Sequence, residues 1–170
     1  MAHLIETQRL FLRPWKSDDA EAFVELCHRD GLCDFTSGTY RDMTLEKALA
    51  FIDRERIRYQ ESKVGRFAVF LKSGELIGVS GLFEMSDEYK GSFEINYRFP
   101  KAYWGQGYGT EVAASILMYA KTALQIKEIF AVVDPANSRS QRVLEKVGMQ
   151  FHAERTHKGM IGQVWKTSLT

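Results

Sequence analysis

The segment YWGQGYGTE, from Tyr103 to Glu111, has glycines at three alternate positions and runs directly into an amphipathic helical pattern. Glycine has no Cβ, so a charged ligand can approach the backbone of Gly105, Gly107 and Gly109 closely. The first amides of a helix have no intrahelical partner, and together with the positive end of the helix dipole they form an anion site. The segment therefore predicts a phosphate cradle at a strand-to-helix junction, with an ordinary flexible turn as the alternative.

The spacing of these glycines excludes the two best-known phosphate loops. The Gly-x-x-x-x-Gly-Lys-Ser/Thr loop of P-loop proteins is absent, and Gly-x-Gly-x-Gly differs from the dinucleotide fingerprint Gly-x-Gly-x-x-Gly. ATP and NAD are therefore disfavoured as ligands.

The composition indicates one domain of ordinary size that spans residues 1–170. A chain of 170 residues buries about 70% of the surface that it exposes when unfolded. Its 23 Lys and Arg residues nearly balance its 22 Asp and Glu residues, and the formal charge of +1 predicts neither a nucleic-acid partner nor a membrane partner. The sequence shows no signal peptide and no apolar run of membrane-helix length, so a cytoplasmic protein is expected.

The cysteines and histidines predict no metal site. Cys27 and Cys33 lack the Cys-x-x-Cys spacing of a redox or zinc site, and His152 and His157 lack partners at zinc-site spacing. Reduced thiols are expected, which agrees with a cytoplasmic location.

The first part of the chain predicts a strand over residues 9–13, followed by two helices. Ser17 is expected to cap the first helix, and Thr44 is expected to cap the second. The second helix has an expected apolar stripe of Leu45, Ala48, Leu49 and Ile52 and an expected solvated face of Arg54, Glu55 and Arg58.

The middle of the chain predicts three consecutive strands. Residues 67–71 and 76–83 are apolar and separated by a short polar turn, which favours a hairpin, and residues 92–99 follow as a third strand. Because side chains alternate between the faces of a strand, this third strand has a polar face of Glu94, Asn96 and Arg98.

The last part of the chain predicts two more helices and three short strands. A helix runs from the glycine segment to about Leu124, and another begins at Asn137 or Ser138 and ends at Gly148. The strands are expected at residues 129–133, 149–154 and 163–169. The order β-α-α-β-β-β-α-β-α-β-β contains no repeat and predicts a mixed α/β domain of the α+β type.

The glycine segment and this order of elements resemble the GNAT superfamily of N-acetyltransferases. The motif Gln/Arg-x-x-Gly-x-Gly/Ala fits if Gly107 and Gly109 are its glycines, although Trp104 then departs from the Gln/Arg preference. The stretches ETQRLFLRPW and DPANSRSQRVLEKVGM are similar to the ribosomal-protein, RimJ/RimL-like branch. The resemblance implies a GNAT fold, with a twisted, mostly antiparallel sheet of about seven strands split by a β-bulge and flanked by four helices.

The resemblance also implies acetyl-CoA as the acyl donor, with its pantetheine arm in the split of the sheet. Carried over to this chain, the main chain of Tyr97, Arg98 and Phe99 would contact the arm, and Asn137 would bond it from the opposite side. The pyrophosphate would face Gly105, Gln106, Gly107, Tyr108, Gly109 and Thr110.

Two residues are candidates for the chemistry. An amine must lose a proton before it attacks a thioester, and Glu94 is the candidate base, directly or through water; a surface carboxylate paired with Arg98 is the alternative. Many relatives protonate the leaving thiolate with a tyrosine, but Leu144 takes that place here. Ser140 matches a serine of the ribosomal-protein branch and becomes the candidate donor and cofactor contact, against the ordinary role of a serine that bonds helix backbone.

The expected function is transfer of an acetyl group to a primary amine in a ternary complex. The acceptor, a protein N-terminus or a small molecule, is left open, as is a homodimer. A non-catalytic acyl-CoA-binding or regulatory domain is the main alternative, because the usual tyrosine is missing, and a plain interaction module is a weaker one. Acceptor specificity is expected in the first two helices, in the segment from Gly31 to Thr44 that connects them, and in the last two strands.

Overall fold

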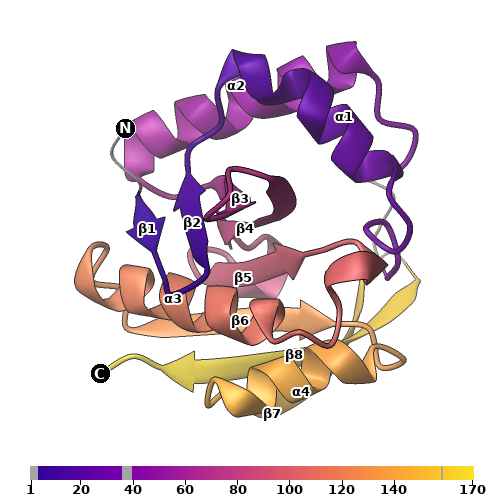
Figure 1. Ribbon diagram of the computed structural model, residues 1–170. Coiled ribbons are helices and arrows are strands. Elements are labelled where there is room, and N and C mark those ends of the chain that lie inside the picture. The colour runs from indigo at the N-terminus through magenta and orange to yellow at the C-terminus, as the bar shows by residue number, and fades with distance from the viewer. Residues whose placement is uncertain (1–3, 36–39, 158) are drawn as a thin grey trace.

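The computed structural model describes residues 4–35, 40–157 and 159–170, which form one mixed eight-stranded sheet and four α-helices (Figure 1). The strand order is β1-β2-β3-β4-β5-β6-β8-β7, and β5 and β6 are the one parallel pair among these residues. The strands are β1 Ile5–Glu6, β2 Leu10–Arg13, β3 Arg66–Leu71, β4 Leu76–Glu84, β5 Phe93–Arg98, β6 Glu128–Val133, β7 Gln150–His157 and β8 Met160–Ser168. The helices are α1 Ala20–His28, α2 Leu45–Ser62, α3 Tyr108–Thr122 and α4 Ser138–Lys146. The predicted fold class and element order are confirmed, with β1 as an additional strand.

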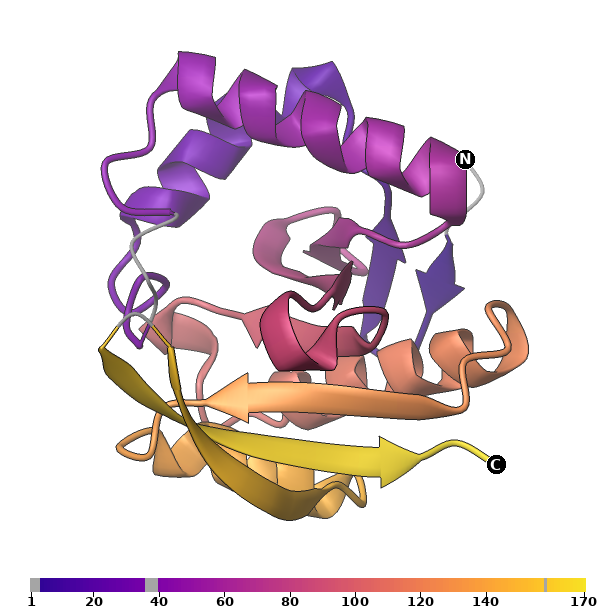
Figure 2. The same ribbon diagram turned by 180° about the vertical axis from the view of Figure 1, so that it is seen from behind.

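The helices cover the two faces of the sheet. Figures 1 and 2 show α1 and α2 on one side of the first strands, with α3 and α4 on the other side. Alternation along β3 explains this arrangement, because Ala68 and Phe70 pack in the core under α1 and α2, whereas Phe67 and Val69 pack in the core under α3. The predicted apolar stripe of α3 is fully buried and consists of Val112, Ala113, Ile116, Leu117 and Ala120.

The sheet opens between β5 and β6, as the resemblance implies. These parallel strands pair only through Phe93 with Ile129 and Glu94 with Phe130. The register of β5 with β4 is regular up to Arg98, and the irregularities of the sheet lie in the β3–β4 and β7–β8 pairs instead. The split is therefore confirmed, and it arises because β6 turns away from β5 and pairs along its length with β8. The bulge expected there is not seen in the described residues of β5.

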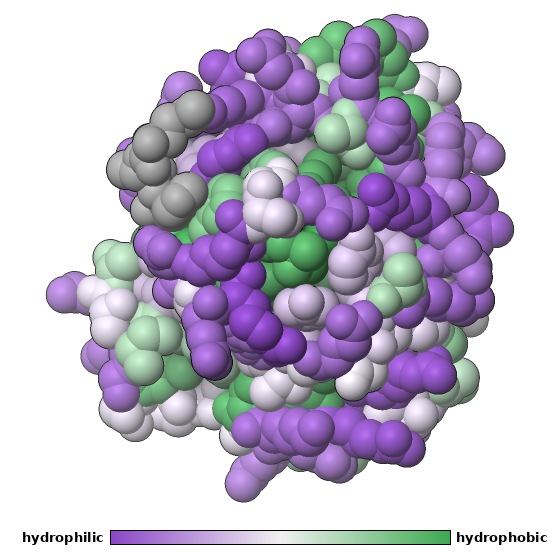
Figure 3. Space-filling model, in the orientation of Figure 1, coloured by the Kyte–Doolittle hydropathy of each residue, from purple (hydrophilic) through white to green (hydrophobic). Residues whose placement is uncertain are grey.

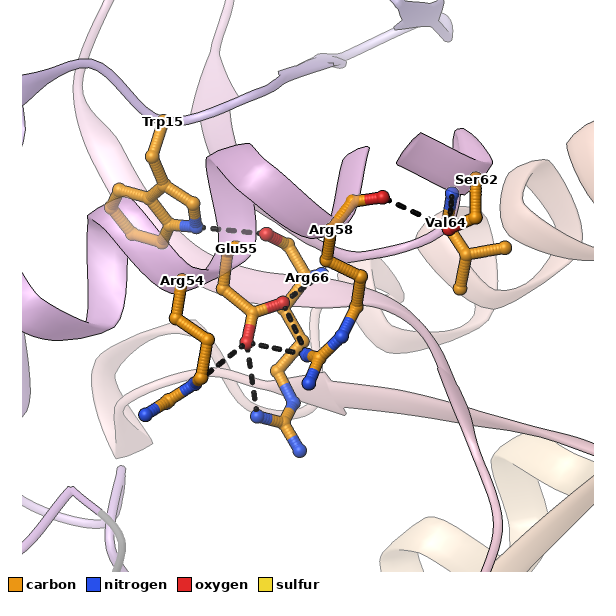
Figure 4. Close-up of polar contacts among 7 residues, drawn as sticks. All are labelled: Trp15, Arg54, Glu55, Arg58, Ser62, Val64 and Arg66. Carbon is orange, nitrogen blue, oxygen red and sulfur yellow. Dashed lines mark hydrogen bonds and ion pairs between the residues drawn. The ribbon is translucent and has the colours of Figure 1, made fainter. Parts of the chain in front are cut away.

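Helix α2 corrects the predicted stripe and solvated face. Its buried residues are Ala48, Phe51, Ile52 and Glu55, whereas Leu45 is 47% exposed. The Glu55 carboxylate accepts hydrogen bonds from the Arg58 guanidinium at 2.8 and 2.9 Å and from the Arg66 backbone at 3.0 Å (Figure 4). Its Oε1 also lies 3.4 Å from Arg66 Nη1, so Glu55 joins α2 to the start of β3.

The N-terminal caps are confirmed at one helix and wrong at the other. Thr44 caps α2 by accepting a hydrogen bond from the Lys47 backbone. Ser17 instead begins a short 3₁₀ turn, and α1 starts three residues later. Asp19 organises this turn, because its carboxylate accepts from the Lys16 backbone and forms a 2.7 Å ion pair with Arg13.

The surface in the orientation of Figure 1 is mostly hydrophilic, and hydrophobic residues gather near its centre, below α1 and α2 (Figure 3). Within the described part of the chain, no helix combines the length and apolar character of a membrane span. The same residues contain no group of three or more His, Cys, Asp or Glu side chains placed to hold a metal ion.

Candidate active site

A cleft of about 710 Å³ lies where the sheet opens. Its walls come from β5, the glycine segment, the first turn of α3, helix α4, the end of β6, the β7–β8 hairpin and the segment that follows α1, with one residue each from β3 and β4. Every predicted site residue except Gln106 lines this cleft: Glu94, Tyr97, Arg98, Phe99, Gly105, Gly107, Tyr108, Gly109, Thr110, Asn137 and Ser140.

The N-terminus of α3 opens into this cleft. Gly107 is the N-cap residue with φ +84°, a left-handed conformation that glycine adopts without strain. No side chain in the described part of the chain caps the helix, and the first intrahelical bond runs from the Glu111 amide to the Gly107 carbonyl. The amides of Tyr108, Gly109 and Thr110 are thus in the first turn, where helices bind anions. Three of the cations that line the cleft belong to α4: Arg139, Arg142 and Lys146.

An arginine near the N-terminus supports the glycine segment from outside the cleft. Arg9 forms a 2.7 Å ion pair with Glu111, donates to the Gln106 carbonyl at 2.8 Å, and lies 4.4 Å from the centre of the Tyr108 ring. The Gln106 side chain donates to the Ala102 carbonyl at 2.6 Å. These bonds explain why Gln106 is absent from the cleft wall, and its backbone contact with phosphate stays a prediction.

Glu94 is partly buried where β5 and β6 part. Burial raises the pKa of its carboxyl to about 7, against the opposing effects of Arg155, a hydrogen bond from the Val132 backbone, Arg66 and Arg98. Glu94 makes no ion pair within 4.0 Å with any side chain that the structure describes, so the alternative of a surface pair with Arg98 is not found. A carboxyl with this pKa exchanges a proton readily near neutral pH.

Ser140 and Tyr97 form a hydroxyl pair on the opposite wall. Tyr97 Oη lies 2.8 Å from Ser140 Oγ and 3.2 Å from the Ser140 carbonyl oxygen. Burial raises the pKa of Tyr97 to about 12 despite the hydrogen bond with Ser140. Both hydroxyls therefore carry their protons at neutral pH. The sequence predicted main-chain contacts from Tyr97 but not this side-chain contact, because nothing in the local pattern links β5 to α4.

Asn137 and Leu144 complete the α4 wall. Asn137 is the N-cap of α4, and its Oδ1 accepts from the Ser140 backbone at 3.1 Å, which leaves its amide group to donate elsewhere. Leu144 is 1% exposed and belongs to the core. The place of the usual tyrosine is thus filled by packing.

Comparison with known proteins agrees with this geometry. Residues 9–150 match the family described as Acetyltransferase (GNAT) domain. The chain is 30% identical over 151 residues to "Uncharacterized N-acetyltransferase YoaA" of Bacillus subtilis, which covers 88% of this chain and 84% of that protein.

Two solved structures share the fold. A GNAT-family acetyltransferase from Bacillus anthracis superposes with a TM-score of 0.79 at 23% identity and covers 97% of this chain and 98% of its own. RimJ of Mycobacterium smegmatis, solved with CoA-disulfide, gives a TM-score of 0.76 at 20% identity and covers 94% of this chain and 81% of its own. The chain therefore belongs to the GNAT acetyltransferase family, whose members transfer the acetyl group of acetyl-CoA to an amine.

Proposed function

We propose that Glu94 and the Ser140–Tyr97 pair carry out this transfer inside the cleft, with the donor held by the first turn of α3. The supporting observation is that these groups line one cleft of about 710 Å³. At one end of the cleft, the uncapped amides of α3 and the nearby cations suit a pyrophosphate. The gap beside β5 suits an extended arm, because residues beyond Glu94 have no paired neighbour in β6.

Glu94 acts as the base. In its ionised form it takes a proton from the acceptor ammonium or amine, directly or through one water. The nitrogen lone pair then forms the new C–N bond at the acetyl carbonyl carbon. The partly buried site and the pKa near 7 suit a proton acceptor that works at neutral pH.

As the C–S bond breaks, Ser140 donates a hydrogen bond to the leaving thiolate, or donates its proton and regains the one that the nitrogen releases as the amide forms. Tyr97 supports this role, because its hydroxyl lies 2.8 Å from Ser140 Oγ and retains its proton. The two hydroxyls thus replace the missing helix tyrosine. The relatives named as N-acetyltransferases favour this catalytic function, and no finding supports the alternative of a non-catalytic binding domain.

Calorimetric titration with acetyl-CoA tests donor binding. Gly107→Val should abolish binding, because a side chain would strain the φ of +84° at the helix N-cap and its Cβ would lie 3.2 Å from Arg9 Nη2, which supports the glycine segment. Gly74→Val is the matched control, since Gly74 also has a positive φ, +92°, but lies in the β3–β4 turn outside the cleft. Unchanged affinity in Gly107→Val would refute the cradle.

Release of coenzyme A, followed with a thiol reagent across a panel of amines, tests the chemistry. Ser140→Ala and Tyr97→Phe should each lower kcat more than they change the affinity for acetyl-CoA. Full activity in both variants would remove the hydroxyl pair from the mechanism.

A further inference from the structure

The face of β5 that points away from α3 carries Glu94, Asn96 and Arg98 in alternation, and all three line the cleft. Tyr97 on the other face reaches Ser140 of α4. Arg98 instead lies on the side of α1 and α2, with its guanidinium 5.3 Å from the centre of the buried Tyr40 ring. The Arg98 side chain is thus on the opposite side of β5 from the helix that receives the donor's phosphates.

Three arginines meet at this part of the cleft. Arg66 of β3, Arg98 of β5 and Arg155 of β7 all line it, and each has a buried Nε without a hydrogen-bond partner among the described residues. All three act electrostatically on Glu94, so their charges lie near its carboxylate. An unpaired buried guanidinium nitrogen costs free energy, which an anionic ligand would offset.

The neighbouring carboxylates neutralise this charge only in part: Glu55 forms an ion pair with Arg66, and Glu94 feels the three charges without forming an ion pair with any described side chain. Asp34, the other acidic residue at this part of the wall, lies 3.6 Å from the ammonium of Lys101. Arg66 forms an ion pair with Glu55, but the Glu55 carboxylate also forms ion pairs with Arg54 and Arg58. Figure 4 shows these cations converging on the single Glu55 carboxylate. Neither Arg98 nor Arg155 makes an ion pair with a side chain that the structure describes.

Acceptors for an amine lie among these cations. Asn96 Oδ1 is buried without a partner, one alternation away from Glu94 on the same strand face. An amide oxygen and a carboxylate are the groups that accept hydrogen bonds from an ammonium or amine. The site therefore combines two acceptors for an amine with guanidinium donors whose planar geometry matches a carboxylate or phosphoryl group.

The mouth beside these charges is apolar. Phe35, Met160 and Ile161 line the cleft and are 46%, 54% and 59% exposed. Figures 1 and 2 show the β7–β8 hairpin ending beside the segment that follows α1. This rim would cover an apolar part of a ligand whose charged end lies deeper.

From these observations we infer that the acceptor is a small primary amine that carries an oxyanion, a carboxylate or a phosphoryl group, close to its amino group. A free α-amino acid with an apolar side chain meets all of these requirements. The inference rests on the proposed function, in which Glu94 receives the proton of the same amine. A protein N-terminus with uncharged first residues offers no anion to the arginines.

Matched acceptors test this inference in the coenzyme A release assay. L-leucine, leucinamide and isopentylamine share an apolar side chain, and only the first carries a carboxylate. The three compounds are compared at equal concentrations of the neutral amine form. A second comparison, of O-phosphoethanolamine with ethanolamine, tests a phosphoryl group in the same way. In at least one comparison, kcat/KM should be at least tenfold higher for the anionic member, and the comparison that responds identifies the oxyanion.

Arginine variants test the residues. Arg98→Gln and, independently, Arg155→Gln should reduce the ratio of anionic to neutral rates at least tenfold. Arg98→Lys should recover part of that ratio. Arg56→Gln is the charge-matched control, because Arg56 lies outside the cleft on α2, and it should keep the wild-type ratio. Using a ratio separates selectivity from any loss of folded enzyme, and Arg155→Gln keeps the test valid if Arg98→Gln fails to fold.

Equal or higher rates with leucinamide, the neutral amines or a neutral peptide N-terminus would overturn the inference. So would a ratio that is unchanged in both Arg98→Gln and Arg155→Gln. In either case normal acetyl-CoA affinity and acetylation of the neutral acceptors would leave the proposed function intact. If the wild-type chain did not bind acetyl-CoA, the proposed function itself would be refuted.

Discussion

Replacing Glu94 with glutamine should lower activity and raise stability at the same time. Loss of a general base typically costs about 10²- to 10⁴-fold in rate, and kcat should fall within that range. Affinity for acetyl-CoA should stay near the wild-type value, because Glu94 lies on the face of β5 that points away from Ser140 and α4. Glu84→Gln, an exposed change on the neighbouring strand, is the control.

The pH profile gives a sharper test. With a pKa of about 7, Glu94 is about one-tenth ionised at pH 6 and about nine-tenths ionised at pH 8. The wild-type rate should therefore rise about tenfold over this range, and the rise should vanish in Glu94→Gln. An acceptor that is already neutral at pH 6, such as an aromatic amine, removes the titration of the substrate from the profile.

The stability effect follows from the same pKa. Because burial raises the pKa of Glu94 from 4.5 to about 7, the native state favours the protonated form. The raised pKa of Glu94 therefore adds to the free energy of unfolding in full below pH 4.5, and this contribution is lost as the pH rises through 7. At about 1.4 kcal/mol per pKa unit, the full loss is about 3 kcal/mol.

Glu94→Gln should thus be more stable than the wild type at pH 8 by up to this amount, a rise in Tm of about 6 to 12 °C for a chain of this size. The gain should disappear near pH 4.5. Urea unfolding at both pH values measures it. A variant that keeps wild-type kcat from pH 6 to pH 8, or that is no more stable at pH 8, would refute the reasoning.

Three other substitutions test features around the site. Gly81→Ala should lower the free energy of unfolding by about 3 kcal/mol or more, because the added Cβ would lie 2.0 Å from the Gly65 carbonyl oxygen. Urea unfolding measures this loss, and Gly65→Ala is the control, because the nearest contact of its Cβ would be at 3.4 Å. Glu55→Gln should cost about 1.5 to 3 kcal/mol, because it removes the charged acceptor that joins Arg54, Arg58 and Arg66, and an unchanged unfolding midpoint would contradict this role. Arg9→Gln should raise KM for acetyl-CoA about tenfold, equivalent to about 1.4 kcal/mol, with a smaller effect on kcat; an equal loss in kcat alone would show that the Arg9 contacts do not position the glycine segment.

The parts of the fold that depend on short-range periodicity could be predicted from the sequence. Alternation along β5 placed Glu94 and Arg98 on one face, and the structure confirms that both line the cleft. The helical stripe of α3 and the cap at Thr44 are likewise local patterns. These features follow from neighbours within a turn or a strand, which a sequence displays directly.

The features that the sequence did not reveal depend on partners from distant segments. Glu55 was expected in solvent because its helical neighbours are charged, but it is buried and forms an ion pair with the distant Arg66 of β3. The Tyr97–Ser140 contact joins β5 to α4, and Arg9 reaches the glycine segment from β2's flank. The two-residue strand β1 is too short for any period to show.

The narrow junction between β5 and β6 has a mechanical consequence. Two residue pairs are the direct strand-to-strand link between the first five strands and the last three. A ligand bound between β5 and β6 would contact both strands and so connect the two parts of the sheet. Amide hydrogen exchange in β5 and β6 should then slow sharply when acetyl-CoA is added, and the slowing should extend to β8, which is linked to β5 through β6 in the described sheet.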